Sequence, residues 1–295
     1  MSQIEVVDLS QWYGSVRVLD QLDFTADAGM VVALVGPNGA GKTSLFRRAV
    51  GLLRGPGRFL ICGRPYADYT HPTRVVGVSL DDSLIQNNLC AGRWLNAVAS
   101  AAKIGRDRQR WCLERVNLSD VVNRRVSHLS AGMKQRLKIA GALLAEPRVL
   151  LLDEPWTGLD PVEADSLRGL LRAQADGGVT VVVSTHALSH IESVADSVIM
   201  LKNGRIIAHD ALEGLLAARG RAVLVRVPVE ETESAIDHLE IAGGRCARQD
   251  HGSIEVAGLD SVEVGRILWN GGLSVMELFT HRRTLEQAAV EAFRD

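Results

Sequence analysis

Continuous runs of apolar residues in the first two thirds of the chain predict strands that are buried on both faces. The clearest run is residues 30–35 (MVVALV), which ends in a glycine-rich segment followed by a helical pattern over 44–53. Similar runs occur at 75–80, 148–152, 179–184 and 197–201. Buried strands that alternate with helices are typical of parallel sheets covered on both faces. The pattern therefore predicts an α/β domain with a mainly parallel sheet.

Two regions of this first part follow other patterns. Residues 4–9 and 18–24 read as short strands of a half-exposed sheet. Between about 90 and 145 the sequence is helical in pattern and rich in Ala, Leu and Arg. We therefore expect a helical insert in the α/β domain.

The character of the sequence changes around Gly220. From residue 221 onward it predicts the order βαββαβ with an extra helix, which is the split-βαβ arrangement of ferredoxin-like modules. The predicted strands are 222–228, 245–249, 252–257 and 273–279, and the predicted helices are 230–242, 260–270 and 284–293. The sequence thus predicts two domains, residues 1–219 and 220–295.

Composition narrows the class of protein. With 46% hydrophobic and 23% charged residues, the chain of 295 residues is neither disordered nor fibrous. A net charge of −2 argues against a nucleic-acid partner. Four scattered cysteines without a CxxC pair fit a reducing cytosol, not a disulfide scaffold or a zinc site. We see no signal peptide, and no apolar run approaches the roughly 18 residues that span a bilayer.

Charge is nevertheless distributed unevenly. Residues 221–295 hold 8 basic and 13 acidic residues, whereas residues 90–138 hold 11 basic and 3 acidic residues. Solvated helix faces would give the same pattern. The alternative is an electropositive surface that faces phosphate, acidic loops of a partner or anionic lipid.

The segment GPNGAGKTS fits the phosphate-loop pattern G-x-x-x-x-G-K-[ST] and lies between a predicted buried strand and a helix. Its glycines let backbone N–H groups surround phosphate oxygens, the lysine reaches the β/γ oxygens, and the threonine hydroxyl suits Mg²⁺. The alternative is a glycine turn with an exposed lysine. The predicted nucleotide-binding residues are Gly36, Pro37, Asn38, Gly39, Ala40, Gly41, Lys42, Thr43 and Ser44.

Two acidic residues directly follow the strand predicted at 148–152. Asp153 would hold Mg²⁺ through water, and Glu154 would orient or deprotonate the attacking water. An ordinary strand end with two solvated acids is the alternative. The upstream phosphate loop favours the functional interpretation.

Between these elements, LSAGMKQRL at 129–137 resembles the signature segment of ATP-binding-cassette ATPases. The longer string that continues to DEPWTGLDP resembles nucleotide-binding subunits of exporters for drugs, antibiotics, peptides or polysaccharides. The resemblance covers residues 4 to about 215, and the C-terminal module, including 284–286 (TLE), resembles the appended domain of that branch. It implies a P-loop NTPase cassette with an N-terminal antiparallel β subdomain, a helical subdomain at about 82–145, and a small C-terminal α+β domain.

The resemblance also implies roles for single residues. Ser130 and Gly132 match signature positions that contact the γ-phosphate bound by the opposite subunit. Asp160 matches a loop that communicates across the dimer, and His186 matches the γ-phosphate sensor. Tyr13 stands where the family stacks an aromatic ring on adenine, although the neighbouring Trp12 leaves the choice of ring open.

One position departs from the family pattern. Asp81 stands where these proteins usually have a glutamine that reaches Mg²⁺ and the attacking water. An aspartate still offers an oxygen ligand for Mg²⁺, so we expect it to substitute; altered coupling to the membrane subunit is the alternative. Arg93 also stands where a glutamate is common.

The resemblance thus implies an ATP- and Mg²⁺-dependent ATPase. It would act as a homodimer, or a pseudo-symmetric dimer, on a separate multi-span membrane permease, and would be cytoplasmic and peripheral on the inner face of the membrane. One rival is a non-transport ATPase of the same superfamily. The other is a module that clamps on ATP with weak turnover, against which Glu154 and His186 argue.

Overall fold

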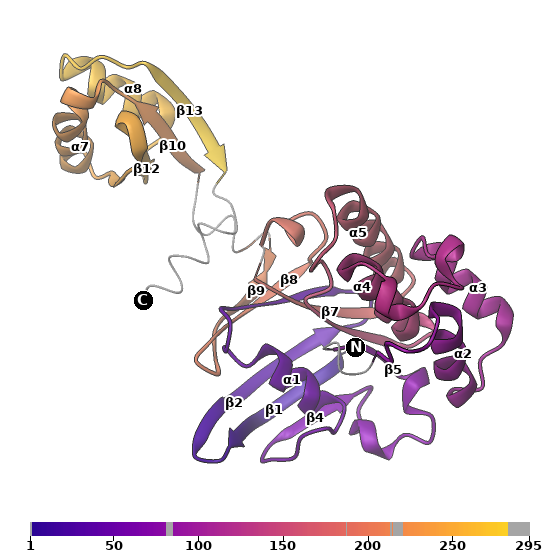
Figure 1. The fold of residues 1–295 in the computed structure, drawn as a ribbon. Coiled ribbons are helices and arrows are strands. Elements are labelled where there is room, and N and C mark those ends of the chain that lie inside the picture. Colours follow the sequence, from indigo (N-terminus) through magenta and orange to yellow (C-terminus); the bar gives the residue numbers. More distant parts are fainter. Residues whose placement is uncertain (1, 81–84, 187, 213, 215–220, 283–295) are drawn as a thin grey trace. The chain divides into compact units, whose positions relative to one another are not determined.

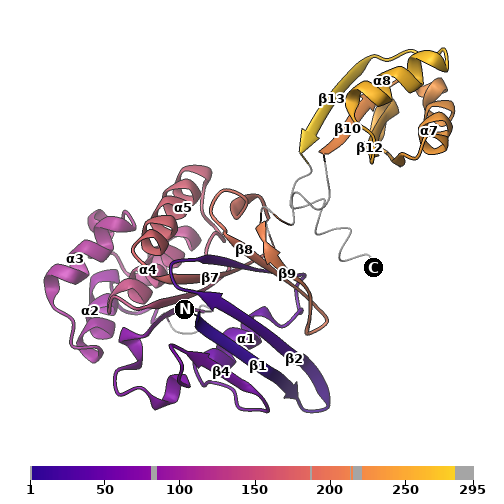
Figure 2. The same cartoon turned by 180° about the vertical axis from the view of Figure 1, so that it is seen from behind.

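The computed structural model describes residues 2–80, 85–186, 188–212, 214 and 221–282 (Figures 1 and 2). The chain divides into two compact units, residues 1–212 and 213–295. The predicted boundary at 219/220 falls in 215–220, outside the described residues. In the described part, no helix combines the length and the apolar character that crossing a membrane requires.

A six-stranded sheet forms the centre of the first unit, in the order β5-β6-β7-β3-β8-β9. Its first five strands are parallel, and β9 pairs antiparallel with β8 at the edge. The strands are β3 (Val31–Val35), β5 (Val76–Ser79), β6 (Val149–Asp153), β7 (Thr180–Thr185), β8 (Ser197–Lys202) and β9 (Arg205–Ala211). Every side chain of β3 and of β7 is buried, which confirms the prediction of a mainly parallel, covered sheet.

A second, antiparallel sheet has the order β2-β1-β4. It consists of β1 (Ser2–Tyr13), β2 (Val16–Asp27) and β4 (Arg58–Ile61). Inward-facing residues of β1 and β2 share one apolar core with Leu45 and Phe46 of helix α1 (Lys42–Ala49) and with strands of the parallel sheet. Helix α1 therefore sits where both sheets converge (Figure 1).

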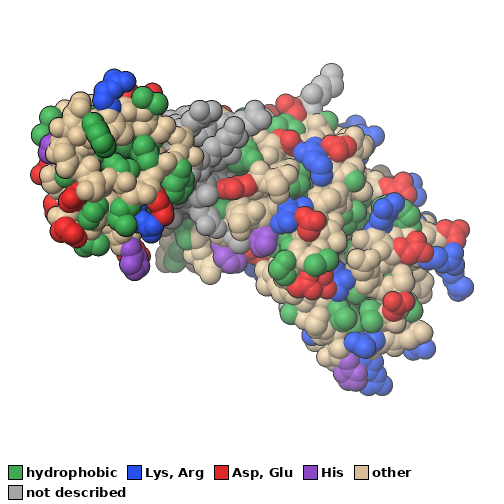
Figure 3. All heavy atoms as spheres, turned by 90° about the horizontal axis from the view of Figure 1, so that it is seen from above, with side chains coloured by type: hydrophobic (Ala, Val, Ile, Leu, Met, Phe, Trp, Pro, Cys, Tyr) green, Lys and Arg blue, Asp and Glu red, His purple; other side chains and the backbone are tan. Residues whose placement is uncertain are grey.

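Three helices form the predicted insert: α2 (Ala91–Ala101), α3 (Arg106–Arg115) and α4 (Ala131–Leu143). Helix α5 (Pro161–Asp176) follows β6, and its N-cap residue Asp160 forms a reciprocal capping box with Glu163. Acidic and basic side chains are interspersed over the face of this unit shown in Figure 3. On α5, for example, Arg168 pairs with Asp165 at 2.9 Å.

The second unit has a four-stranded antiparallel sheet of order β11-β12-β10-β13. Its elements are β10 (Arg221–Arg226), α7 (Thr232–Ile241), β11 (Arg245–Arg248), β12 (Ser253–Ala257), α8 (Ser261–Asn270) and β13 (Glu277–Arg282). Apolar residues of α7 and α8 share a core with β10 and β12, as the predicted βαββαβ order requires. The last strand begins at Glu277, later than the predicted 273, because 271–276 form a turn and an irregular segment. The helix predicted at 284–293 lies outside the described residues.

Candidate ATP site

The loop between β3 and α1 encloses a hollow of about 210 Å³. It is lined by Val18, residues 38–44, Asp153 and Glu154. Gly41 has φ +109°, and a Cβ atom there would lie 2.8 Å from the carbonyl oxygen of Val18. Only glycine suits this backbone, because a side chain would be strained and would clash. The loop leads directly into the N-terminus of α1, where backbone N–H groups and the helix dipole favour a bound anion.

Lys42 lies at the floor of this hollow and is buried. Its ammonium donates to the carbonyl oxygens of Gly36 at 2.7 Å and Pro37 at 3.3 Å, and lies 3.8 Å from Glu154 Oε1. Burial lowers the pKa of the Lys42 ammonium, while the carboxylates of Glu154 and Asp153 act in the opposite direction. The charge is thus held inside the loop by neutral carbonyls and by acids of the neighbouring strand.

The side chains of Thr43 and Asp153 are in contact beside the phosphate loop. The Thr43 hydroxyl donates to Asp153 Oδ2 at 2.6 Å, so two hard oxygen ligands from α1 and β6 lie side by side. Among the described residues, no group of three or more His, Cys, Asp or Glu is arranged so that it could hold a metal ion. The pair fits Mg²⁺, which usually takes one or two protein oxygens together with phosphates and waters. The predicted ligand Asp81 lies outside the described residues.

Glu154 directly follows β6 and contacts residues of α1 and residues in or just beyond β7. Its φ of +46° is in the left-handed region, and its backbone N–H donates to the Ser184 hydroxyl at 2.9 Å. Its Oε2 lies 2.9 Å from Nδ1 of His186, just beyond β7. The structure thus places the Glu154 carboxylate between the Lys42 ammonium and the His186 ring. Phosphoryl transfer can use such a cluster of a carboxylate, a cation and a histidine.

Tyr13 lies beside the phosphate loop. Its hydroxyl is 3.4 Å from the Ser44 hydroxyl, and its side chain is exposed. The neighbouring Trp12 is exposed to a similar extent, and the Arg17 guanidinium lies over one side of its ring, 5.0 Å from the ring centroid. The geometry therefore favours Tyr13 over Trp12 as the ring that an adenine would meet.

The signature residues lie together, away from this hollow. Ser130 caps α4 by accepting a bond from the Met133 N–H at 3.1 Å. A Cβ atom on Gly132 would lie 2.5 Å from the carbonyl oxygen of Gly158, which is two residues before Asp160. Ser130, Gly132 and Asp160 do not line the hollow around Lys42. One chain therefore carries two separate groups of predicted ATP-contacting residues.

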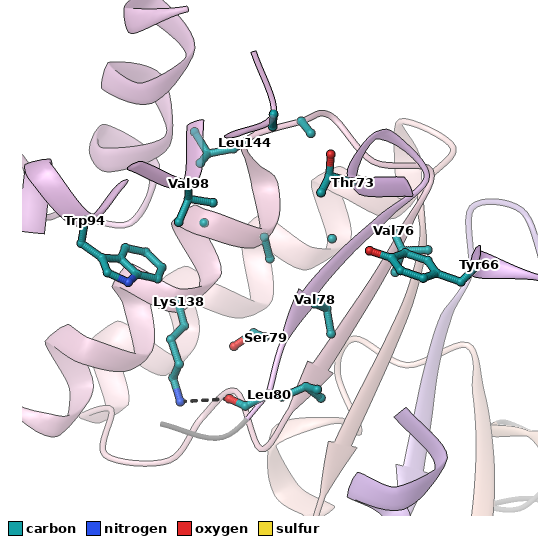
Figure 4. Close-up of a pocket in the computed structure, with 15 residues that line it drawn as sticks. Tyr66, Thr73, Val76, Val78, Ser79, Leu80, Trp94, Val98, Lys138 and Leu144 are labelled. Atoms are coloured by element: carbon teal, nitrogen blue, oxygen red, sulfur yellow. Dashed lines mark hydrogen bonds between the residues drawn. The ribbon is translucent and has the colours of Figure 1, made fainter. Parts of the chain in front are cut away.

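A second hollow, also of about 210 Å³, lies between β5, α2 and α4 (Figure 4). We call it the insert groove; it is lined mainly by apolar residues. Trp94 and Val98 project from α2, and Tyr66 lies on the opposite side. The Lys138 ammonium donates to the Leu80 carbonyl at 3.3 Å. The sequence alone did not predict this groove.

Five of the 11 basic residues of 90–138 show two different uses of their charge. Arg108 and Arg136 donate to backbone carbonyls of neighbouring segments, which is a structural use of their charge. Arg93, Arg106 and Arg110 instead line an open hollow of about 600 Å³ on α2 and α3. Part of the positive charge of the insert is thus used within the fold, and part lines this open hollow.

A phosphate loop between β3 and α1, with an acidic strand end beside it, defines a P-loop nucleotide-binding protein. The sequence model of the ABC transporter family matches residues 19–157. The chain is 31% identical to the uncharacterized ABC transporter ATP-binding protein YdbJ of Bacillus subtilis (strain 168), over 98% of this chain and 94% of that protein. It therefore belongs to the ABC transporter ATP-binding proteins, which confirms the resemblance.

Other similar proteins agree. Identity is 32% to the daunorubicin resistance ATP-binding protein DrrA3 of Streptomyces coeruleorubidus, over 93% of this chain and 90% of that one. It is 31% to the lantibiotic transport ATP-binding protein SrtF of Streptococcus pyogenes, over 72% and 92%. A solved ATP-binding subunit of an ABC transporter superposes with a TM-score of 0.66 at 31% identity, covering 72% of this chain and 91% of that chain. The chain is thus an ATP-binding ATPase of the transport family.

Proposed function

We propose that this chain is the ATP-hydrolysing subunit of an exporter for a drug, antibiotic, peptide or similar substrate. The observation that carries the proposal is the Glu154 carboxylate, held between Lys42 and His186 at the mouth of the phosphate loop. Relatives named for daunorubicin resistance, lantibiotic transport and Nod factor export support the direction of transport and the range of substrates.

Hydrolysis would proceed by in-line attack of water on the γ-phosphate. The Glu154 carboxylate orients this water and accepts its proton. The Lys42 ammonium leaves the loop carbonyls and, with the loop N–H groups, stabilises charge on the phosphoryl oxygens. His186, largely exposed at the end of β7, contacts the γ-phosphate. Tyr13 stacks on the adenine ring.

The oxygens of Thr43 and Asp153 would hold Mg²⁺, with Asp81 as a further predicted ligand. When bound, Mg²⁺ neutralises charge on the β- and γ-phosphate oxygens. Because the Thr43 hydroxyl and Asp153 carboxylate already lie side by side, they need little rearrangement to share one cation.

A second copy would complete each site. Ser130, Gly132 and Asp160 lie apart from the hollow around Lys42, so they are available to the nucleotide of a head-to-tail partner. The N-terminus of α4 suits an anion, because its first N–H groups and the helix dipole favour negative charge. We therefore propose a homodimer, or a pseudo-symmetric dimer, that closes on two ATP molecules.

The membrane permease would press on the insert groove shown in Figure 4. Leu80 lines the groove and immediately precedes Asp81, which the resemblance places between the nucleotide and the membrane subunit. A cytoplasmic segment of the permease with apolar side chains fits this lining. The chain would thus lie peripherally on the inner face of the membrane.

Phosphate release by the purified chain tests the proposal. Glu154→Gln keeps the side-chain size but removes the proton acceptor, so we expect the rate to fall by at least about 100-fold. Glu114→Gln, an exposed change on α3, is the matched control and should leave the rate unchanged. Equal, negligible rates in wild type and Glu154→Gln would refute the hydrolase assignment. Lys42→Ala should abolish binding of a fluorescent ATP analogue.

A further inference from the structure

Ser184 is a polar residue inside an otherwise apolar strand. It follows three buried valines in β7, and its side chain is fully buried. In the parallel pairing of β6 with β7, its register partner is Asp153. The resemblance gives this position no role, and a buried hydroxyl is costly unless its hydrogen bonds are made.

The Ser184 hydroxyl makes two hydrogen bonds, and both go to the candidate site. It donates to Asp153 Oδ1 and accepts the backbone N–H of Glu154 at 2.9 Å. One hydroxyl therefore holds the side chain of one acidic residue and the backbone of the next. With Oδ1 held by Ser184, the second oxygen of Asp153 faces the Thr43 hydroxyl.

The bond to the Glu154 N–H supports an unusual backbone. Glu154 has φ +46°, a conformation that L-residues adopt only when surrounding contacts enforce it. On the other side of this residue, Gln135 Nε2 lies 3.4 Å from the Glu154 carbonyl oxygen. Ser184 and Gln135 thus hold the peptide groups on both sides of the Glu154 Cα atom, and so fix the point from which its carboxylate reaches toward Lys42 and His186.

We propose that Ser184 is a positioning residue for ATP hydrolysis, which aligns the Mg²⁺-binding oxygen of Asp153 and the backbone of Glu154 through one hydroxyl. This inference rests on the proposed function, since it assigns Asp153 and Glu154 their roles there. A serine that only filled the core would have partners outside the site. Here both partners are the two acidic residues on which the proposed chemistry depends.

The test compares Ser184→Ala and Ser184→Cys with Ser197→Ala. Cysteine keeps the shape of serine with a larger sulfur atom and leaves no cavity, but it is a weak hydrogen-bond partner, so it keeps the test valid if the alanine variant unfolds. Ser197 is the matched control, because it is a buried serine whose hydroxyl donates to the Asp210 carbonyl at 3.0 Å, away from the site. Thermal unfolding of each variant checks that it is folded.

We expect both Ser184 variants to lower kcat about 10-fold, with little change in KM, as losing a partner of a metal-binding carboxylate commonly does. The Mg²⁺ concentration that half-maximally enhances binding of a fluorescent ATP analogue should rise by a similar factor. In a Glu154→Gln background, Ser184→Ala should cause a smaller further loss of rate than in wild type, because Asp153 is then the only one of the two positioned acidic residues that still acts. Ser197→Ala should behave as wild type in every assay.

Wild-type kcat and an unchanged Mg²⁺ titration in folded Ser184 variants would overturn the inference. So would an equal loss in Ser197→Ala, which would show a general effect of removing a buried hydroxyl. If the wild-type chain hydrolyses no ATP, the proposed function fails. The Mg²⁺ titration of nucleotide binding would still report separately whether Ser184 aligns Asp153.

Discussion

Replacing Gly132 by alanine tests the contact between the signature helix and the turn before α5. Gly132 is buried in the first turn of α4. An added Cβ atom would lie 2.5 Å from the Gly158 carbonyl oxygen and 3.1 Å from Glu163 Oε2. Real Cβ atoms do not approach a backbone oxygen this closely, so α4 or the turn at Gly158 must move.

Two opposing effects set the magnitude. Alanine gains about 1 kcal/mol over glycine in a helix, whereas overpacking a tight contact costs about 1–3 kcal/mol. The net effect on the free energy of unfolding is therefore between nearly zero and a loss of about 2 kcal/mol. At about 2–4 °C of Tm for each kcal/mol in a unit of this size, Tm should stay level or fall by several degrees. Turnover should fall more sharply, because the displaced segments carry Ser130 and Asp160.

Gly169→Ala is the matched control on the neighbouring helix α5. A Cβ atom there would meet nothing within 4 Å, so only the helix-propensity gain of about 1 kcal/mol remains. We expect its Tm to rise by about 2–4 °C, with wild-type turnover. Calorimetry measures the Tm of both variants, and phosphate release measures their turnover. A rise in Tm and full turnover in Gly132→Ala, equal to those of Gly169→Ala, would refute the reasoning.

Three further predictions concern stability and reactivity. Leu151→Ala should lower the free energy of unfolding, measured in urea, by about 2–5 kcal/mol, because the fully buried Leu151 side chain lies in a central strand. Asp196→Ala should lower the same free energy by about 1–3 kcal/mol. The buried Val31 N–H donates to Asp196 at 2.7 Å and would lose its acceptor. Asp196→Asn should lower the free energy of unfolding by less. Iodoacetamide at pH 8 should label Cys90 before Cys112, because burial raises the pKa of the Cys112 thiol to about 11.

The parallel sheet was predictable because its signal is local. The run at 148–152 corresponds to β6 at Val149–Asp153, and the run at 197–201 to β8 at Ser197–Lys202. The phosphate loop was equally accessible, since its residues are contiguous. Strand β4 was missed because four residues are too few for a pattern. Strand β9 had a usable signal: Asn203-Gly204, both with positive φ, forms the tight turn after β8.

The internal geometry of the site depends on contacts that spacing does not reveal. The expectation that His186 faces the γ-phosphate came from its position in the family motif. The 2.9 Å contact between His186 and Glu154 joins residues that are 32 positions apart. The bonds of Ser184 depend likewise on the register of β6 with β7, which pairs Asp153 with Ser184. A shift of one residue would turn the hydroxyl to the other face of the sheet. Such contacts require the packed structure.

Helix α4 connects the parts of the site that the sequence shows only as separate motifs. Within four residues, its polar side chains reach three segments: Gln135 contacts the Glu154 carbonyl at 3.4 Å, Arg136 pairs with Glu163 at 2.6 Å, and Lys138 donates to the Leu80 carbonyl. The insert groove and the Glu154 turn are thus held by one helix whose first turn carries the signature. Because packed helices shift as units between discrete arrangements, a partner that moves α4 from the groove must also change its contact with Glu154. Under the proposed function, this arrangement provides a direct physical route between the permease contact proposed at the insert groove and the Glu154 carboxylate.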